Sequence, residues 1–155
     1  MRSIRIITTM MVFASMVCIT ACGEEKTASL EGHDDIVAVL QKLPECYDNL
    51  AITKAIYTEN AILHYQDGQT GQINAITGSK EIGNYLKEKG KVGCLIKISI
   101  QDIKEEADKA HAVYHITAQE RKSGLDYTFN CSAEMVKQGQ VWKIKEQRTK
   151  YTHYR

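Results

Sequence analysis

The sequence predicts an α+β fold in which about three helices precede an antiparallel sheet. Two observations support this prediction. Between residues 36 and 90 apolar residues recur at helical spacing, whereas from Gly93 onward they alternate with polar residues. The clearest strands lie within residues 125–151, where alternating segments flank the turn Gln138-Gly139, as in a hairpin with one buried face. Because an isolated hairpin is marginal in water, the rest of the chain must cover that face.

Residues 1–22 have the pattern of an export signal rather than of a folded element. Arg2 and Arg5 precede an uncharged apolar run, which is typical of a secretory signal. The run ends in Ile19-Thr20-Ala21-Cys22, which resembles the lipobox of bacterial lipoproteins. The resemblance implies that residues 1–21 are removed as a signal peptide. It also implies that Cys22 becomes a lipidated N-terminus that anchors the protein in a membrane.

The residues after Cys22 suggest a location and a tether. Gly23 resembles the residue that follows the cysteine in lipoproteins passed to the outer membrane of diderm bacteria. We therefore expect an exported, lipid-anchored protein that faces the periplasm in such a cell. The alternative is an uncleaved membrane anchor, because the uncharged run from Ile6 to Gly23 approaches the length of a span. Residues 22–33 lack periodicity and predict a flexible tether, followed by a domain over residues 34–155.

The first two helices are predicted from capping residues and apolar spacing. Asp34 or Asp35 is expected to cap a helix over residues 36–47, which Pro44 kinks or interrupts. A second helix is expected over residues 50–57.

Two short strands and a third helix follow. The strands are expected over residues 61–65 and 73–76, with glycine-containing turns between them. Ser79 is expected to cap the third helix and Gly90 to end it.

Four long strands complete the prediction. In the first two, the residues of one face are Ile96, Ile98, Ile100, Ala110, Ala112, Tyr114, Ile116 and Ala118. The opposite face of the second strand carries His111, Val113 and His115. We expect Glu146 and Arg148 in the last strand to continue the apolar face of Trp142 and Ile144.

Three short motifs in this order resemble the NTF2-like superfamily, particularly its SnoaL-like and ketosteroid-isomerase-like branches. They are the helix exit at residues 55–61, the third helix with Gly78, Ile82 and Tyr85-Leu86, and the final turn with Gly139 and Trp142-Lys143-Ile144. The resemblance covers residues 35–151. It implies a strongly curved antiparallel sheet, or cone, with the helices packed on its concave side and a pocket between them.

The resemblance also bears on catalysis. Isomerase-type members use a carboxylate base on the first strand and a protonated acid with a tyrosine as oxyanion donors. The corresponding positions fall at His64 and Tyr65 and near Cys131, and none of these is a carboxylate. The lack of a carboxylate at these positions favours a domain without catalytic activity. His64, Tyr65 and Glu146 are the candidates under the alternative that the protein is an isomerase or cyclase.

Side chains on faces predicted to point inward form the candidate ligand pocket. They are Tyr47, Tyr85, Tyr114, Tyr127, Phe129, Cys131, Trp142 and Arg148. A buried tyrosine hydroxyl needs a hydrogen-bond partner, which a ligand can supply. The alternatives are an ordinary core position for Trp142 and an ion pair at the strand end for Arg148.

No metal site and no cofactor are predicted. His111 and His115 lie about 13 Å apart in a strand, too far to share an ion. Cys94 and Cys131 are expected on strands separated by a third, too far apart for a disulfide. Cys46 could meet either of them, or all three are small buried hydrophobes.

The composition limits the partners. The formal net charge is +1, which argues against nucleic acid as a partner. We therefore expect an envelope domain that binds a small apolar or amphipathic molecule or a partner protein. Besides this binding domain and the isomerase or cyclase considered above, a third alternative is a structural homodimer that pairs across the convex face of the sheet. Such a dimer would bury His111, Val113 and His115.

Overall fold

The computed structural model describes residues 30–154, so the predicted signal peptide and Cys22 lie outside the described residues. Three α-helices, one 3-10 helix and a six-stranded sheet confirm the α+β prediction. The elements in order are α1 (Asp34–Gln41), η1 (Leu43–Tyr47), α2 (Leu50–Ile56), β1 (Tyr57–Gln66), β2 (Ile73–Thr77), α3 (Ser79–Gly90), β3 (Cys94–Glu106), β4 (Lys109–Glu120), β5 (Asp126–Gln138) and β6 (Val141–Tyr154). Within this part of the chain, no helix has the length and apolarity to cross a membrane.

The first helix is shorter than predicted. His33, rather than Asp34 or Asp35, occupies the N-cap of α1, and both acids lie in the first turn. There they complement the partial positive charge at the helix N-terminus. α1 ends at Gln41, and Pro44 lies in the first turn of the separate helix η1. Proline is accepted in a first turn because its missing N–H would be unpaired there, so the helix is interrupted near Pro44, as predicted, but at Lys42 before the proline.

The ends of α2 and α3 are set by Asn49 and Gly78. The side chain of Asn49 accepts a hydrogen bond from the Ala51 N–H at 2.9 Å and so caps α2. Gly78, not Ser79, is the N-cap residue of α3, and its φ of 101° lies in a region that favours glycine. The Gly78 N–H donates to the Ala61 carbonyl at 2.8 Å, which ties the start of α3 to β1.

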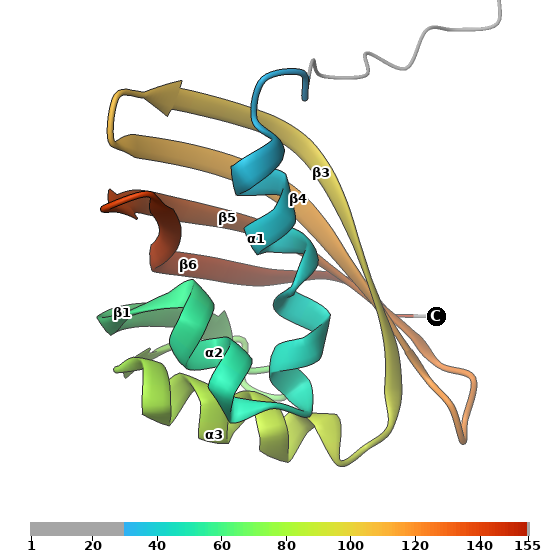
Figure 1. The fold of residues 1–155 in the computed structure, drawn as a ribbon. Helices are drawn as coiled ribbons and strands as arrows, with labels where there is room; N and C mark the ends of the chain where they lie inside the picture. The colour runs from blue at the N-terminus through green and yellow to red at the C-terminus, as the bar shows by residue number, and fades with distance from the viewer. Residues whose placement is uncertain (1–29, 155) are drawn as a thin grey trace, which may run out of the picture.

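The six strands form one strongly curved sheet with the helices on its concave side (Figure 1). The strand order is β2-β1-β6-β5-β4-β3. The four long strands β3 to β6 are antiparallel, as predicted, whereas β1 pairs with β6 in parallel. β1 starts directly after α2 at Tyr57, earlier than the predicted Ala61. We call the face of the sheet that lies away from the helices the convex face.

A register shift in β6 decides which side chains point inward. Ile144 pairs with Met135, and Glu146 pairs with the preceding residue Glu134, so Lys145 is an extra residue between them. This bulge reverses the alternation, and Gln147 becomes the inward residue with 4% exposure. The prediction that Glu146 and Arg148 continue the face of Trp142 and Ile144 is therefore wrong.

The core lies between the helices and the concave face. α1 contributes the fully buried Ile36 and Leu40, and α3 contributes Ile82 and Leu86. Opposite them, β4 and β5 carry the small side chains Ala110, Ala112 and Ala133 beside Met135. Small side chains at these positions allow the helices to pack closely on the sheet.

Candidate functional site

A row of inward side chains crosses the middle of the concave face. The register aligns Ile100 of β3 with Tyr114 of β4, Cys131 of β5 and Thr149 of β6. Tyr65 of β1 extends the row, because it pairs with Thr149 in the parallel register. Cys131 Sγ lies 3.7 Å from Thr149 Oγ1. The concave face therefore combines apolar, phenolic, thiol and hydroxyl groups in one line.

The centre of this row is buried and uncharged. Tyr114 has an exposed fraction of 0%, and its hydroxyl has no hydrogen-bond partner among the described residues. Burial raises the pKa of Tyr114 well above its ordinary value and raises the pKa of Cys131 to about 12. Both groups are therefore neutral near pH 7. A neutral thiol is a poor nucleophile, so the row offers hydrogen bonds rather than covalent chemistry.

Half-buried aromatic side chains border this row. Phe129 contacts Tyr151 edge to face with ring centroids 5.6 Å apart, and Tyr65 lies 4.6 Å from Tyr85 of α3 between ring centroids. Burial raises the pKa of Tyr85 to about 12, with smaller contributions from Tyr65 and Asp67. We call Tyr65, Tyr85, Phe129 and Tyr151 the aromatic rim.

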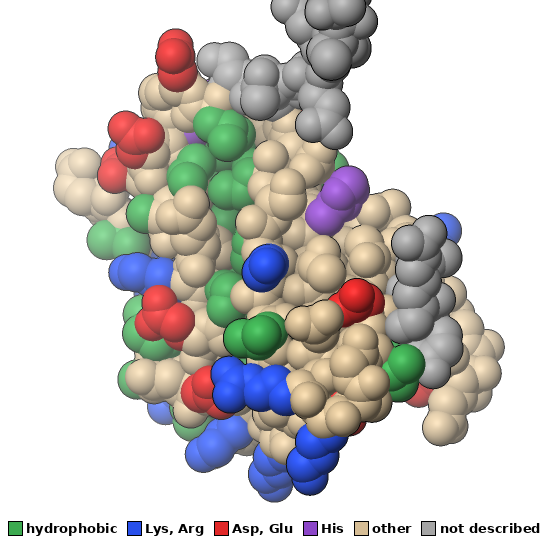
Figure 2. Space-filling model, turned by 90° about the vertical axis from the view of Figure 1, so that its right-hand side faces the viewer, with side chains coloured by type: hydrophobic (Ala, Val, Ile, Leu, Met, Phe, Trp, Pro, Cys, Tyr) green, Lys and Arg blue, Asp and Glu red, His purple; other side chains and the backbone are tan. Residues whose placement is uncertain are grey.

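The helices leave part of β3 uncovered on its inner side. Ile96, Ile98 and Ile100 pack against the core but are only partly buried. Figure 2, which looks at the molecule from the side of β3, shows hydrophobic side chains reaching the surface above a group of lysine and arginine side chains. The inner side of β3 is therefore only partly covered by the helices, next to the buried polar row.

Five of the eight predicted pocket residues occupy three different environments. Tyr114 and Cys131 lie in the polar row, and Phe129 belongs to the aromatic rim together with Tyr85. Tyr47 lies on η1, where burial raises its pKa, with smaller contributions from Cys131 and Tyr85.

The other three pocket candidates lie apart from the row. Tyr127 is half-buried on β5 and shares the concave face with Phe129 by strand alternation. Trp142 is a core residue with 2% exposure, and Lys137 Nζ lies 5.7 Å from the centroid of its ring. Arg148 is exposed on the convex face, so it does not line the concave surface.

The three catalytic candidates do not meet at one point. Tyr65 faces inward, whereas His64 and Glu146 point to the convex face. His64 Nε2 lies 3.1 Å from Glu146 Oε1, and the same oxygen accepts from the Arg148 guanidinium at 2.5 Å. These three convex side chains form an ion-pair chain.

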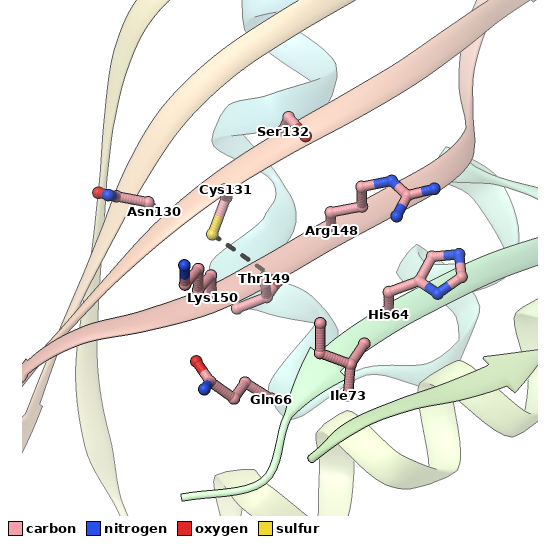
Figure 3. Close-up of a pocket in the computed structure, with 9 residues that line it drawn as sticks. All are labelled: His64, Gln66, Ile73, Asn130, Cys131, Ser132, Arg148, Thr149 and Lys150. Atoms are coloured by element: carbon pink, nitrogen blue, oxygen red, sulfur yellow. Dashed lines mark hydrogen bonds between the residues drawn. The ribbon is translucent and has the colours of Figure 1, made fainter. Parts of the chain in front are cut away.

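A shallow hollow with a volume of about 320 Å³ lies on the convex face beside the paired side chains of His64, Glu146 and Arg148. Its lining residues are His64, Gln66, Ile73, Asn130, Cys131, Ser132, Arg148, Thr149 and Lys150. Figure 3 shows Arg148 and His64 at one end of the hollow and Lys150, Asn130 and Gln66 toward the other. Sequence reasoning missed this hollow.

A signal for the hollow was present in the sequence. Glu146, Arg148 and Lys150 have the same parity as Trp142 and Ile144, so unbroken alternation would place three charges on an apolar face. Burying unpaired charges is strongly unfavourable. That conflict indicates a bulge between Ile144 and Glu146, which would have placed the three charges together on the other face.

The histidines and cysteines considered above as metal ligands or disulfide partners all lie within residues 30–154. No group of three or more potential metal ligands occurs there. His111 is paired with Glu134 on the convex face, with 2.6 Å between Nδ1 and Oε1. Cys46, Cys94 and Cys131 are free thiols, and β4 separates the strands of Cys94 and Cys131, as predicted.

Comparison with known proteins relates this chain by structure alone. No family model matches the sequence, and no curated protein matches it. A crystal structure of a ketosteroid isomerase-like protein from Erwinia carotovora atroseptica superposes with a TM-score of 0.60 at 16% identity, covering 78% of this chain and 93% of that one. An NTF2-like protein of unknown function from Shewanella oneidensis gives 0.60 at 19% identity, with coverages of 76% and 98%.

A further NTF2-like protein of unknown function, from Shewanella baltica, superposes with a TM-score of 0.58 at 16% identity, covering 83% of this chain and 98% of that one. Identities this low relate the folds and not the functions. The three superpositions cover 76–83% of this chain, and the chain therefore has the NTF2-like fold.

Proposed function

We propose that the protein is an exported, lipid-anchored binding domain that holds a small, uncharged amphipathic molecule on the concave side of its sheet without transforming it. The uncovered side chains of β3 and the aromatic rim suit the apolar part of such a molecule. The neutral row of Tyr114, Cys131 and Thr149 suits a hydroxyl or carbonyl group. Small-molecule sites in general combine a mainly apolar wall with a few polar groups.

The Tyr114 hydroxyl is the observation that carries this proposal. Leaving a buried hydroxyl without a hydrogen bond destabilises a protein by about 1–3 kcal/mol. Native structures leave few such groups, and each requires an explanation. Tyr114 adjoins Cys131 and Ile100 in the register, so a ligand that reaches it also contacts the apolar surface of β3.

The proposal excludes catalysis for two reasons. The positions at which the resembling isomerases carry carboxylates hold His64 or Tyr65 and Cys131 here, and none of these is a carboxylate. Cys131 is buried and its pKa is raised to about 12, so it supplies neither a base nor a reactive thiolate.

Thermal unfolding with 1-decanol tests the binding site, with decane as the purely apolar comparison. We expect decanol to stabilise the full chain more than decane does, because its hydroxyl bonds with Tyr114. Tyr114→Phe should raise the unliganded stability by about 1 kcal/mol, roughly 3 °C in Tm, because it removes an unpaired buried hydroxyl. The same variant should lose the advantage of decanol over decane.

Tyr151→Phe is the matched control. It removes a hydroxyl from the aromatic rim, where Tyr151 is only half-buried, and should leave both quantities close to wild type. Equal stabilisation by decane and decanol in the wild-type chain would refute the polar row as a binding element. An unchanged decanol effect in Tyr114→Phe would refute the role of Tyr114.

Membrane fractionation tests the lipid anchor. Cys22→Ser removes the thiol that the lipobox resemblance assigns to lipid attachment, and we expect the protein to move from the membrane to the soluble exported fraction. The effect should be nearly complete, since each buried CH₂ of an acyl chain contributes about 0.8 kcal/mol to anchoring. Cys18→Ser, four residues earlier, is the control and should stay with the membrane. Retention of Cys22→Ser in the membrane would favour an uncleaved anchor.

A further inference from the structure

We propose that the hollow on the convex face is a second binding site, which takes a small organic anion through its carboxylate or phosphate group. This site lies on the opposite face of the sheet from Tyr114 and goes beyond the proposed function. Strand alternation gives the hollow charged and polar donors that are absent from the concave surface, although Cys131 and Thr149 of the polar row also line it.

The donors of the hollow come from three adjacent strands. β6 supplies Arg148 and Lys150, and β5 supplies Asn130 and Ser132. His64 of β1 closes one end. The register places Arg148 between His64 and Ser132, and it places Lys150 opposite Asn130. Groups from three strands are thus held at fixed spacing around one volume, as a preorganised site requires.

Most of these donors have spare capacity. Within residues 30–154, Lys150 makes no ion pair, and the side chains of Asn130 and Ser132 make no hydrogen bond. Arg148 donates to Glu146 at 2.5 Å, and a guanidinium has five N–H donors. Carboxylate and phosphate groups are the acceptors that a guanidinium binds most effectively.

Glu146 limits the positive charge of the hollow. Its carboxylate pairs with Arg148 and with His64, which holds both side chains at the same end. The Arg148 side chain is 64% exposed and the Glu146 side chain 27%, so solvent reaches this pair from the side of Arg148. An ion pair that is open to solvent on one side contributes modestly to stability, so an incoming anion can compete for Arg148.

The size and the apolar content of the hollow indicate a small organic molecule. Its volume of about 320 Å³ lies at the lower end of the range for small-molecule sites. Ile73, on the edge strand β2, is 72% exposed beside the charged groups and offers a contact for a hydrocarbon part. An anion with a short apolar body therefore fits better than an inorganic ion.

Calorimetric titration of the full chain with three probes tests this site. Benzoate carries a carboxylate, phenyl phosphate carries a phosphate, and benzamide has the shape of benzoate without its charge. We expect at least one of the two anions to bind at least tenfold more tightly than benzamide. The stronger of the two identifies which oxyanion the site prefers. Equal binding of all three probes, or no binding of either anion, would overturn the proposal.

Two substitutions in the ion-pair chain should change anion affinity in opposite directions. Arg148→Gln removes the main donor and should weaken binding at least tenfold. Glu146→Gln removes the competing carboxylate and should tighten binding about threefold or more, since Arg148 is then free to pair with the ligand. Both side chains are on the surface of the sheet, and circular dichroism should show unchanged folding.

Lys97→Gln is the matched charge control. Lys97 is exposed on β3 and points to the convex face, and β4 separates it from β5, the nearest strand that lines the hollow. Its substitution should leave the dissociation constant unchanged. Equal weakening by Lys97→Gln and Arg148→Gln would indicate only general electrostatic attraction. A solution dimer that buries Arg148 and excludes the probes would likewise overturn the proposal.

Discussion

Replacing Gly90 with alanine is expected to lower the free energy of unfolding by about 2–3 kcal/mol. Gly90 is the last residue of α3, and a Cβ built on its backbone would lie 2.3 Å from the Tyr47 carbonyl oxygen. In a helix without such a contact the same change usually stabilises by about 0.5–1 kcal/mol. Because the contacted atom belongs to the backbone of η1, one of the two helices must move. Urea unfolding measures the effect.

Two other glycines serve as controls. A Cβ at Gly68, in the turn after β1, has no atom within 4 Å, so Gly68→Ala should change stability by less than about 0.5 kcal/mol. At Gly83 the nearest atom, at 2.2 Å, is Leu50 Cδ1, the end of a flexible side chain. Gly83→Ala should therefore cost less than Gly90→Ala. Equal stability of the Gly90 and Gly68 variants would contradict the close packing of α3 on η1.

The long strands could be predicted from the sequence because one of their faces is buried. Ala110, Ala112, Tyr114 and Ile116 all lie on the concave face with at most 4% exposure, as their alternation indicates. A strand covered on one side leaves a period of two in its sequence. The same rule placed Cys131 and Ala133 inward on β5.

Counting alternation alone assumes an unbroken strand, and only the charges that it places on the apolar face of β6 indicate a break. The extra residue Lys145 shifts the register of β6 and exchanges Glu146 for Gln147 on the inner face. Likewise, the parallel pairing of β1 with β6 depends on contacts between distant segments. Tertiary packing determines such pairing, and it produces no periodic pattern of apolar residues in the sequence of either strand.

The residues of the candidate sites also divide into those that regular alternation places and those whose position depends on a bulge or on pairing between distant segments. Tyr114, Phe129 and Cys131 lie on the concave face, as their alternation indicates, because each lies in a regular part of a strand. The convex hollow was missed because it needs the bulge and the parallel register together. Only that combination places Arg148 next to His64.

The buried pair of Tyr57 and Gln147 should behave as one energetic unit. The Tyr57 hydroxyl donates to Gln147 Oε1 between β1 and β6, and the two residues have exposures of 1% and 4%. Gln147→Met keeps the side-chain length but leaves the Tyr57 hydroxyl unpaired, and we expect it to destabilise by about 2 kcal/mol. Tyr57→Phe should destabilise by about 1–2 kcal/mol, because it leaves the buried Gln147 Oε1 without its hydrogen bond, whereas Nε2 still donates to Thr149 Oγ1.

The double variant decides whether the hydrogen bond itself stabilises the parallel contact of β1 with β6. If it does, Tyr57→Phe with Gln147→Met should cost at least about 1 kcal/mol less than the sum of the single variants, measured by urea unfolding. Tyr114→Phe is the matched comparison: it also removes a buried hydroxyl, but an unpaired one, and so should stabilise. Additive losses in the double variant would mean that Tyr57 and Gln147 contribute separately through packing. In that case the apolar contacts of Tyr57 with the core, rather than this bond, would hold β1 against β6.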